Sequence, residues 1–284
     1  MRIALGFWGI TRSLKYTIDS INKHIFTPLK QQNIEYIIYI HTFSINSEYN
    51  NLRTGELNIN LNNEEYKLLN PNFIKIDDQD KIKDSINISQ YKSQPDPWGT
   101  NYNSVENFIC AMYSKNELTK MIEESNEQFD YVIFLRPDVK YLNPLNINSL
   151  NHVKDNVICV PNFCLFHEFN DRFAMTNMCS YKIYGTLFNE LLEYSKTRKL
   201  HSEECQAYLL KQKNFRIILI PFYFNRIRFN GFELKDDTIN EFKPKVVNNY
   251  RDKSTNTDIN QNVLMSLNKD VDNNRKASMG LFIN

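Results

Sequence analysis

A candidate catalytic carboxylate, Asp138, follows the most continuous apolar run of the chain, which extends from Tyr131 to Leu135 and is followed by Arg136 and Pro137. A carboxylate held at the end of a buried strand is well placed to bind Mg²⁺ or Mn²⁺ that also touches substrate phosphates. A simpler interpretation is an ion pair between Arg136 and Asp138 that terminates the strand. Asp138 is therefore our candidate metal ligand.

A second candidate site is the turn Gly9-Ile10-Thr11-Arg12, which follows an apolar run from Arg2 to Trp8. Gly9 allows a tight turn, and Thr11 or Ser13 could cap the next helix, so that backbone N–H groups and the Arg12 guanidinium face a phosphate. An ordinary turn with a solvated Arg12 is equally compatible. The chain has no G-x-G-x-x-G and no G-x-x-x-x-G-K-[ST], which argues against a dehydrogenase and an ATPase.

Three further carboxylates could act as a general base. Asp171 could accept a proton from a hydroxyl nucleophile, or it could cap a turn or pair with the neighbouring arginine. Glu203 and Glu204 come directly after His201 and Ser202. Ser202 suits the N-cap of a helix, and acidic residues in a first turn complement the helix dipole, so a structural role is sufficient for at least one glutamate. A functional role would place one of them in a cleft with His201.

An aromatic residue, Trp98, lies in the loop 93–102, which contains two prolines and a glycine. Such loops can cover a sugar or a base by stacking, although the segment could equally be a plain connector. Thr42 follows another apolar run, 34–40, and is placed to lie near a bound ligand.

Strands and helices are predicted to alternate, and this arrangement would position these residues. We expect strands at 2–8, 34–40, 73–76, 131–135, 157–160, 163–169 and 215–220, and helices at 14–30, 104–125, 181–198 and 203–213. Strand, helix and strand within about 40 residues form a βαβ unit. The fold class is therefore α/β with a central, mostly parallel sheet flanked by helices. Ligands of such sheets bind at the carboxyl ends of the strands, where the candidate residues lie.

Composition limits the functional classes. The chain has 284 residues, 42% of them hydrophobic and 24% charged, as expected of a folded protein. Its formal net charge is +1, so no nucleic-acid partner is expected. The five cysteines form no C-x-x-C pair, and no apolar run approaches the roughly 20 residues of a transmembrane helix. We expect a cytoplasmic location, with one domain at 1–235 and a polar C-terminal extension at 236–284.

In their order along the chain, these motifs resemble a family of GT-A type glycosyltransferases that use nucleotide sugars and occur in large DNA viruses and bacterial polysaccharide clusters. The resemblance rests on the turn 9–13, on 39–42, on 129–139, on 170–174 and on 201–204. It implies a GT-A-like, Rossmann-like fold and transfer of a sugar from a UDP- or GDP-linked donor to a hydroxyl of a glycan acceptor. For a viral protein the location would be the host cytoplasm.

The resemblance also implies roles for individual residues. Gly9, Thr11 and Arg12 would hold the diphosphate, and Thr42 would lie near the nucleoside. Asp138 takes the last position of the D-x-D metal motif, whose first acidic position is occupied here by Arg136. One ligand for Mn²⁺ or Mg²⁺ is therefore missing, and Arg136 could neutralise the phosphate itself.

Two alternatives stay open at this point. The chain could be a non-catalytic carbohydrate- or protein-binding module that keeps the fold after losing the D-x-D motif. For an enzyme, an inverting mechanism needs a base such as Asp171, Glu203 or Glu204, whereas a retaining mechanism needs none.

Overall fold

A computed structural model describes residues 1–166 and 169–235, so the predicted C-terminal extension at 236–284 lies outside the described residues. The strands are β1 (Arg2–Trp8), β2 (Glu35–Ser44), β3 (Tyr49–Asn51), β4 (Glu56–Ile59), β5 (Phe73–Asp78), β6 (Tyr131–Leu135), β7 (Val139–Tyr141), β8 (Val157–Pro161), β9 (Ala174–Asn177), β10 (Arg216–Ile220), β11 (Phe224–Ile227) and β12 (Glu233–Leu234).

The α-helices are α1 (Leu14–Ile21), α2 (Thr27–Gln31), α3 (Gln79–Ser85), α4 (Asn103–Glu124), α5 (Tyr181–Gly185), α6 (Leu191–Thr197) and α7 (Ser202–Gln212). A π-helical turn at Asn22–Phe26 joins α1 to α2. Short 3₁₀ helices lie at Leu52–Thr54, Glu65–Leu69, Ile88–Tyr91, Ile147–His152 and Leu187–Glu190. Among the described residues, no helix is both long enough and apolar enough to cross a membrane.

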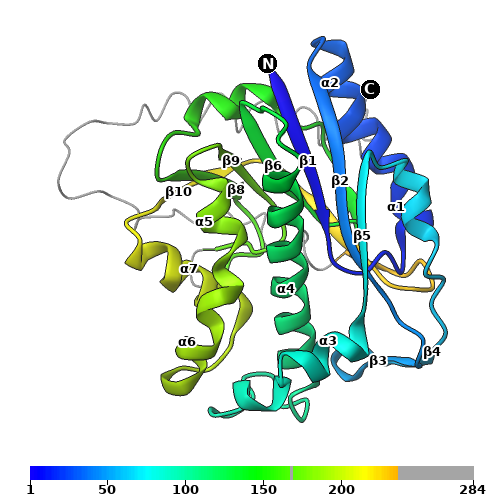
Figure 1. The fold of residues 1–284 in the computed structure, drawn as a ribbon. Helices are drawn as coiled ribbons and strands as arrows, with labels where there is room; N and C mark the ends of the chain where they lie inside the picture. The colour runs from blue at the N-terminus through cyan, green and yellow to red at the C-terminus, as the bar shows by residue number, and fades with distance from the viewer. Residues whose placement is uncertain (167–168, 236–284) are drawn as a thin grey trace, which may run out of the picture.

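The central sheet has seven strands in the order β10-β8-β9-β6-β1-β2-β5 (Figure 1). All neighbouring pairs are parallel except those made by β9, which runs antiparallel to β6 and β8. The other six strands therefore share one direction, and their carboxyl ends meet at one edge. The predicted α/β fold with a mostly parallel sheet and flanking helices is confirmed.

Side chains of β1 alternate between two cores, as the period of a strand requires. Ile3, Leu5 and Phe7 pack in the core that contains α1 and α2, whereas Ala4 and Trp8 pack in the core that contains α4 and α5. Figure 1 shows α4 crossing one face of the sheet, with α5, α6 and α7 beside it. Trp8 therefore ends its strand on the α4 face.

Close packing sets the position of α4. A Cβ atom added to Gly6 of β1 would lie 2.7 Å from Leu118 Cδ2, and one added to Gly185 of α5 would collide with Thr119. Both glycines therefore allow α4 to approach its neighbours more closely than any larger residue would permit. This close packing against β1 and α5 determines where the α4 side chains lie relative to the carboxyl edge of the sheet.

Several sequence-based predictions of elements are corrected. The described part of 163–169 contains an isolated bridge between Phe166 and Phe169 and no strand, and the antiparallel strand follows as β9 instead. The predicted helix 181–198 is divided into α5, a 3₁₀ turn and α6. The β3–β4 hairpin, β7 and β11 were not predicted, because each of these strands has only three or four residues.

Candidate functional site

A cleft with about 1080 Å³ of empty space, part of it open to solvent, lies at the carboxyl edge of the sheet. Its walls come from the turn after β1, the β3–β4 hairpin, the loop ahead of α4, α4 itself, the turn after β6, the segment ahead of β9, α7 and β11. Six of the residues proposed from sequence line it: Gly9, Arg12, Trp98, Arg136, Asp138 and Asp171. Motifs separated by up to about 160 residues in sequence thus meet in one cavity, as the topology requires.

Six arginines line this cleft: Arg12, Arg53, Arg136, Arg172, Arg226 and Arg228. Two acidic residues, Asp138 and Asp171, line it with them. Two more carboxylates pair with lining arginines, since Glu56 contacts Arg12 and Arg228 and Glu203 contacts Arg172. Among the described residues, six arginines and four carboxylates thus meet at this cleft, a concentration of cations that the overall net charge of +1 does not reveal.

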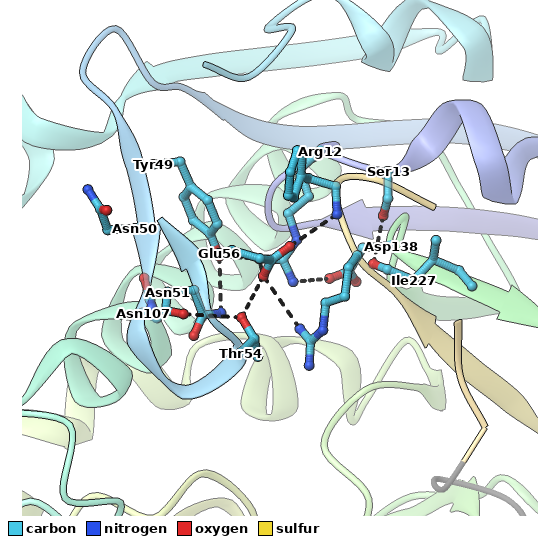
Figure 2. A network of polar contacts seen from close by, with 12 residues as sticks. Arg12, Ser13, Tyr49, Asn50, Asn51, Thr54, Glu56, Asn107, Asp138 and Ile227 are labelled. Atoms are coloured by element: carbon cyan, nitrogen blue, oxygen red, sulfur yellow. Dashed lines mark hydrogen bonds and ion pairs between the residues drawn. The ribbon is translucent and has the colours of Figure 1, made fainter. Parts of the chain in front are cut away.

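Arg12 lies at the centre of a buried ion network (Figure 2). Its Nη1 is 3.3 Å from Glu56 Oε2, and its Nη2 is 3.5 Å from Asp138 Oδ2. Glu56 also accepts hydrogen bonds from the Thr54 hydroxyl at 2.7 Å and from the backbone N–H of Phe229 at 3.0 Å. The network therefore fastens the β3–β4 hairpin to the turn after β1 and to the segment after β11.

Asp138 is the predicted metal ligand, and its surroundings are cationic. Arg136 donates from Nε to Asp138 Oδ1 at 2.9 Å and from Nη2 to Oδ2 at 2.7 Å. Burial alone would raise the pKa of Asp138, but the charges of Arg136, Arg12 and Arg228 together lower it. One carboxylate that already accepts a bidentate arginine and faces two more does not fit a divalent cation, which needs several oxygen ligands. Among the described residues, no three acidic, histidine or cysteine side chains gather into a metal-binding cluster.

Two of the arginines, Arg228 and Arg53, have a lowered pKa, whereas, against the effect of burial, Tyr49, Asp138 and Glu56 raise the pKa of Arg12. Burial first, and then the charges of Arg12 and Arg226, lower the pKa of Arg228 to about 10 against the opposing effect of Glu56 and Asp138. Burial likewise lowers the pKa of Arg53, with Arg226 adding to the effect. An anion in the cleft would relieve this repulsion, so the arrangement favours binding of a negatively charged ligand.

The turn after β1 and the start of α1 are held in place by hydrogen bonds to other segments of the protein. Gly9 has a φ of +95°, and its backbone N–H donates to Ser114 Oγ of α4 at 2.8 Å. Ser114 also lies 2.8 Å from His41 Nδ1. At the start of α1, the backbone N–H of Lys15 donates to Glu65 Oε2 at 3.2 Å. These two N–H donors are thus used within the protein and are not free to bind a phosphate.

Asp171 reaches the cleft, whereas the two predicted glutamates do not line it. Glu203 is buried and accepts a hydrogen bond from Arg172 Nη2 at 3.2 Å and another from the Ser202 hydroxyl. Ser202 is not the predicted N-cap but the first residue of α7, and His201 precedes it. Glu203 is therefore placed to hold Arg172. Asp171 also pairs with this arginine, its Oδ1 lying 3.7 Å from Arg172 Nε, but unlike Glu203 it lines the cleft, where it could receive a proton.

The loop that carries Trp98 is organised by Asp96, a residue that sequence reasoning missed. Its carboxylate accepts backbone hydrogen bonds from Trp98 at 2.9 Å, Thr100 at 2.5 Å and Tyr102 at 3.0 Å. Burial would raise the pKa of Asp96, but these three bonds lower it overall. Arg53 Cζ lies 5.7 Å from the centre of the Trp98 ring. An aromatic ring is thus held at the cleft beside a cation.

Two other predicted contacts lie outside the cleft lining. Thr11 is buried in the turn, and Thr42 is buried within β2, which continues four residues beyond the predicted end at Ile40. Conversely, Tyr49, Arg53 and Glu56 belong to the unpredicted β3–β4 hairpin. The sequence signal that could have revealed the hairpin is Gly55, which adopts a left-handed conformation with φ +68° between the two strands.

No protein-family model and no curated protein matches this sequence. Among solved structures, the chain is similar to the glycosyltransferase GlyE of Streptococcus pneumoniae TIGR4 in its apo form (12% identity, TM-score 0.37, 76% of this chain and 44% of that chain). It is also similar to apo mouse xyloside xylosyltransferase 1 (12% identity, TM-score 0.41, 77% and 85%). The chain spans less than half the length of the pneumococcal protein. At these identities and scores the likeness says nothing about which residues act.

Proposed function

We propose that this chain is a glycosyltransferase of GT-A type that transfers a sugar from a nucleoside diphosphate sugar, UDP- or GDP-linked, to a hydroxyl of an acceptor glycan. The observation that carries the proposal is the cleft at the carboxyl edge of the sheet, where six arginines line the same cavity as a carboxylate, Asp171. A diphosphate is the kind of ligand that several guanidinium groups bind by charge-assisted hydrogen bonds.

The arginines would act on the leaving group. As the bond between sugar and diphosphate breaks, negative charge grows on the leaving oxygen, and fixed cations stabilise that charge as it develops. Arg12, Arg136 and Arg228 are the candidates, because all three line the cleft around Asp138. Since the donor set at Asp138 does not fit a divalent cation, no step of this mechanism depends on one.

Asp171 would act as the general base in an inverting reaction. The carboxylate would accept the proton of the acceptor hydroxyl while the oxygen attacks the anomeric carbon and the nucleoside diphosphate leaves. Both Asp171 and Glu203 pair with Arg172, but Asp171 lines the cleft, whereas Glu203 does not and accepts hydrogen bonds from Arg172 and Ser202. Trp98 would stack on the base or on a sugar ring, held in place by Asp96.

A specific observation favours the second candidate, a non-catalytic binding module. The bidentate bond from Arg136 to Asp138 shows that this acidic position is already satisfied within the protein. Such a module would bind the same nucleotide sugars without turning them over.

The test is incubation with a panel of UDP- and GDP-linked sugars and glycan acceptors, in Mn²⁺ and separately in EDTA, with release of UDP or GDP as the readout. We expect release in both buffers, and we expect Asp171→Asn to abolish release while UDP or GDP alone still binds. Binding without release from any donor would favour the binding module. No binding of any donor would contradict both candidates.

A further inference from the structure

A fully buried lysine lies beneath the cleft, and the mechanism above does not use it. Lys115 of α4 is 0% exposed, and its Nζ donates to Gln206 Oε1 at 2.6 Å. The same nitrogen lies 3.9 Å from the centre of the Tyr184 ring and 5.6 Å from that of Trp8. Burial lowers the pKa of Lys115 to about 7, although Asp171 and Cys205 raise it in part. Burying a charged amine costs free energy. Groups whose pKa is strongly shifted in this way are concentrated at functional sites.

Around this lysine, three buried polar atoms have no hydrogen-bond partner among the described residues. They are Trp8 Nε1, Asp171 Oδ1 and the Tyr184 hydroxyl. Each such atom costs on the order of 1–3 kcal/mol if it stays unpaired, so three at one place call for an explanation. Trp8 and Asp171 line the cleft, as does Gln206, whereas Tyr184 does not. Asp171 Oδ1 lies 3.7 Å from Arg172 Nε, an ion pair that is too long for a hydrogen bond. A ligand in the cleft could therefore supply the hydrogen-bond partner of Trp8 Nε1 and of Asp171 Oδ1.

Trp8 also lies beside one of the arginines of the cleft. The guanidinium carbon of Arg136 lies 4.8 Å from the centre of its ring, and Arg136 binds Asp138. A group bound over Trp8 would thus lie between the arginines proposed for the diphosphate and the proposed base, Asp171. In a nucleotide sugar, the group attached directly to the diphosphate is the sugar.

We propose that Trp8, Gln206 and Asp171 form the floor of a subsite for the sugar ring of the donor, whose hydroxyl groups complete the hydrogen bonds that the chain leaves open. A sugar hydroxyl can accept from Trp8 Nε1 and another can donate to Asp171 Oδ1, because each hydroxyl is both donor and acceptor. Lys115 is a positioning residue here. It fixes the Gln206 carboxamide, whose Nε2 donates to the Ser202 carbonyl at 3.1 Å. This inference rests on the proposed function.

The test compares sugar-bearing and sugar-free nucleotides by calorimetry. UDP and GDP are titrated beside UDP-glucose, UDP-galactose and GDP-mannose. For each nucleotide sugar, the ratio between its dissociation constant and that of its own nucleoside diphosphate gives the contribution of the sugar to affinity. Trp8→Phe keeps an aromatic ring near Arg136 and removes the indole N–H donor together with part of the buried ring. We expect it to reduce the contribution of the sugar about three- to tenfold, the worth of one hydrogen bond.

The matched control is Tyr184→Phe, which removes another unpaired polar atom beside Lys115 but outside the cleft lining. We expect it to leave the ratio unchanged, and thermal unfolding checks that both variants fold. If no nucleotide sugar binds more tightly than its own nucleoside diphosphate, or if Trp8→Phe leaves the ratio unchanged, the subsite is wrong while the proposed function stands. If UDP and GDP do not bind at all, the proposed function itself fails.

Discussion

Arg228 lies in the cleft near other arginines that repel its charge, and a bound anion would reduce this repulsion. Its guanidinium is largely buried, lies 3.8 Å from Glu56, and has the nearby charges of Arg12 and Arg226. Burial and these cations lower its pKa to about 10, so the charged form is less stable than in water, although it still predominates at neutral pH. A diphosphate in the cleft would supply the opposite charge that the chain itself supplies only in part.

Replacing Arg228 should therefore weaken ligand binding without lowering the stability of the protein. We expect Arg228→Gln to weaken UDP or GDP binding about tenfold or more, the worth of a charge-assisted hydrogen bond, while the free energy of unfolding does not decrease. Calorimetry and urea denaturation measure the two effects. Unchanged affinity would remove Arg228 from the diphosphate site, and a large loss of stability would show that its role is structural.

Lys115 should give the protein a characteristic pH dependence. The unfolded lysine has a pKa of 10.5 and the folded one a pKa of about 7, so between these values the unfolded chain binds one proton more. The free energy of unfolding should therefore rise with pH from 7 towards 10, by up to about 1.4 kcal/mol per pH unit from this residue. Lys115→Met should lack that slope. Parallel pH profiles of the two proteins in urea denaturation would refute the assignment.

The predictable part of the site consists of residues next to strong strands. Gly9, Arg12, Arg136 and Asp138 follow long apolar runs, and the carboxyl ends of parallel strands must meet. Thr42 was expected to follow a strand and lie near the ligand. Instead, β2 continues through His41 to Ser44 in pairing with β5, so Thr42 is buried within the strand. Glu203 looked available in sequence, since the salt bridge to Arg172 is a contact across 31 residues.

At the scale of elements, the β3–β4 hairpin is the part of the cleft that is least evident in the sequence. It brings Tyr49 and Glu56 to Arg12, which donates a hydrogen bond to the Tyr49 hydroxyl (Figure 2). The strands are three and four residues long and lie in an Asn-rich segment, so their alternation is too short to detect. Their position depends on the ion network together with a small apolar cluster, in which Tyr49 and Ile59 of the hairpin pack with Phe43 and Cys110.

A substitution at Glu56 tests this dependence. Glu56→Gln would leave Arg12 and Arg228 buried with less opposite charge, and removal of one partner from a buried pair is strongly destabilising. We expect a loss of about 3 kcal/mol in the free energy of unfolding, measured in urea. The control is Glu64→Gln, which affects an exposed ion pair with Lys67 and should change stability by less than about 1 kcal/mol. Equal effects of the two substitutions would contradict the network.

For the whole molecule, the alternation of elements predicted the fold class and the edge at which the site lies. The order of the strands was not predictable, because β9 inserts antiparallel between β6 and β8 and is only four residues long. The formal net charge of +1 gave no sign of the arginine-lined cleft, since a sum over 284 residues says nothing about how charges are distributed.

The central claim is that arginines, and not a divalent cation, bind a nucleoside diphosphate in this cleft. The most direct measurement is calorimetric titration of UDP and GDP in EDTA, beside uridine and guanosine, at low and at raised salt concentration. We predict that one diphosphate binds at least about tenfold more tightly than its nucleoside, that EDTA does not change this, and that salt weakens it. A diphosphate that binds no better than its nucleoside, or only when Mn²⁺ is added, would contradict the account.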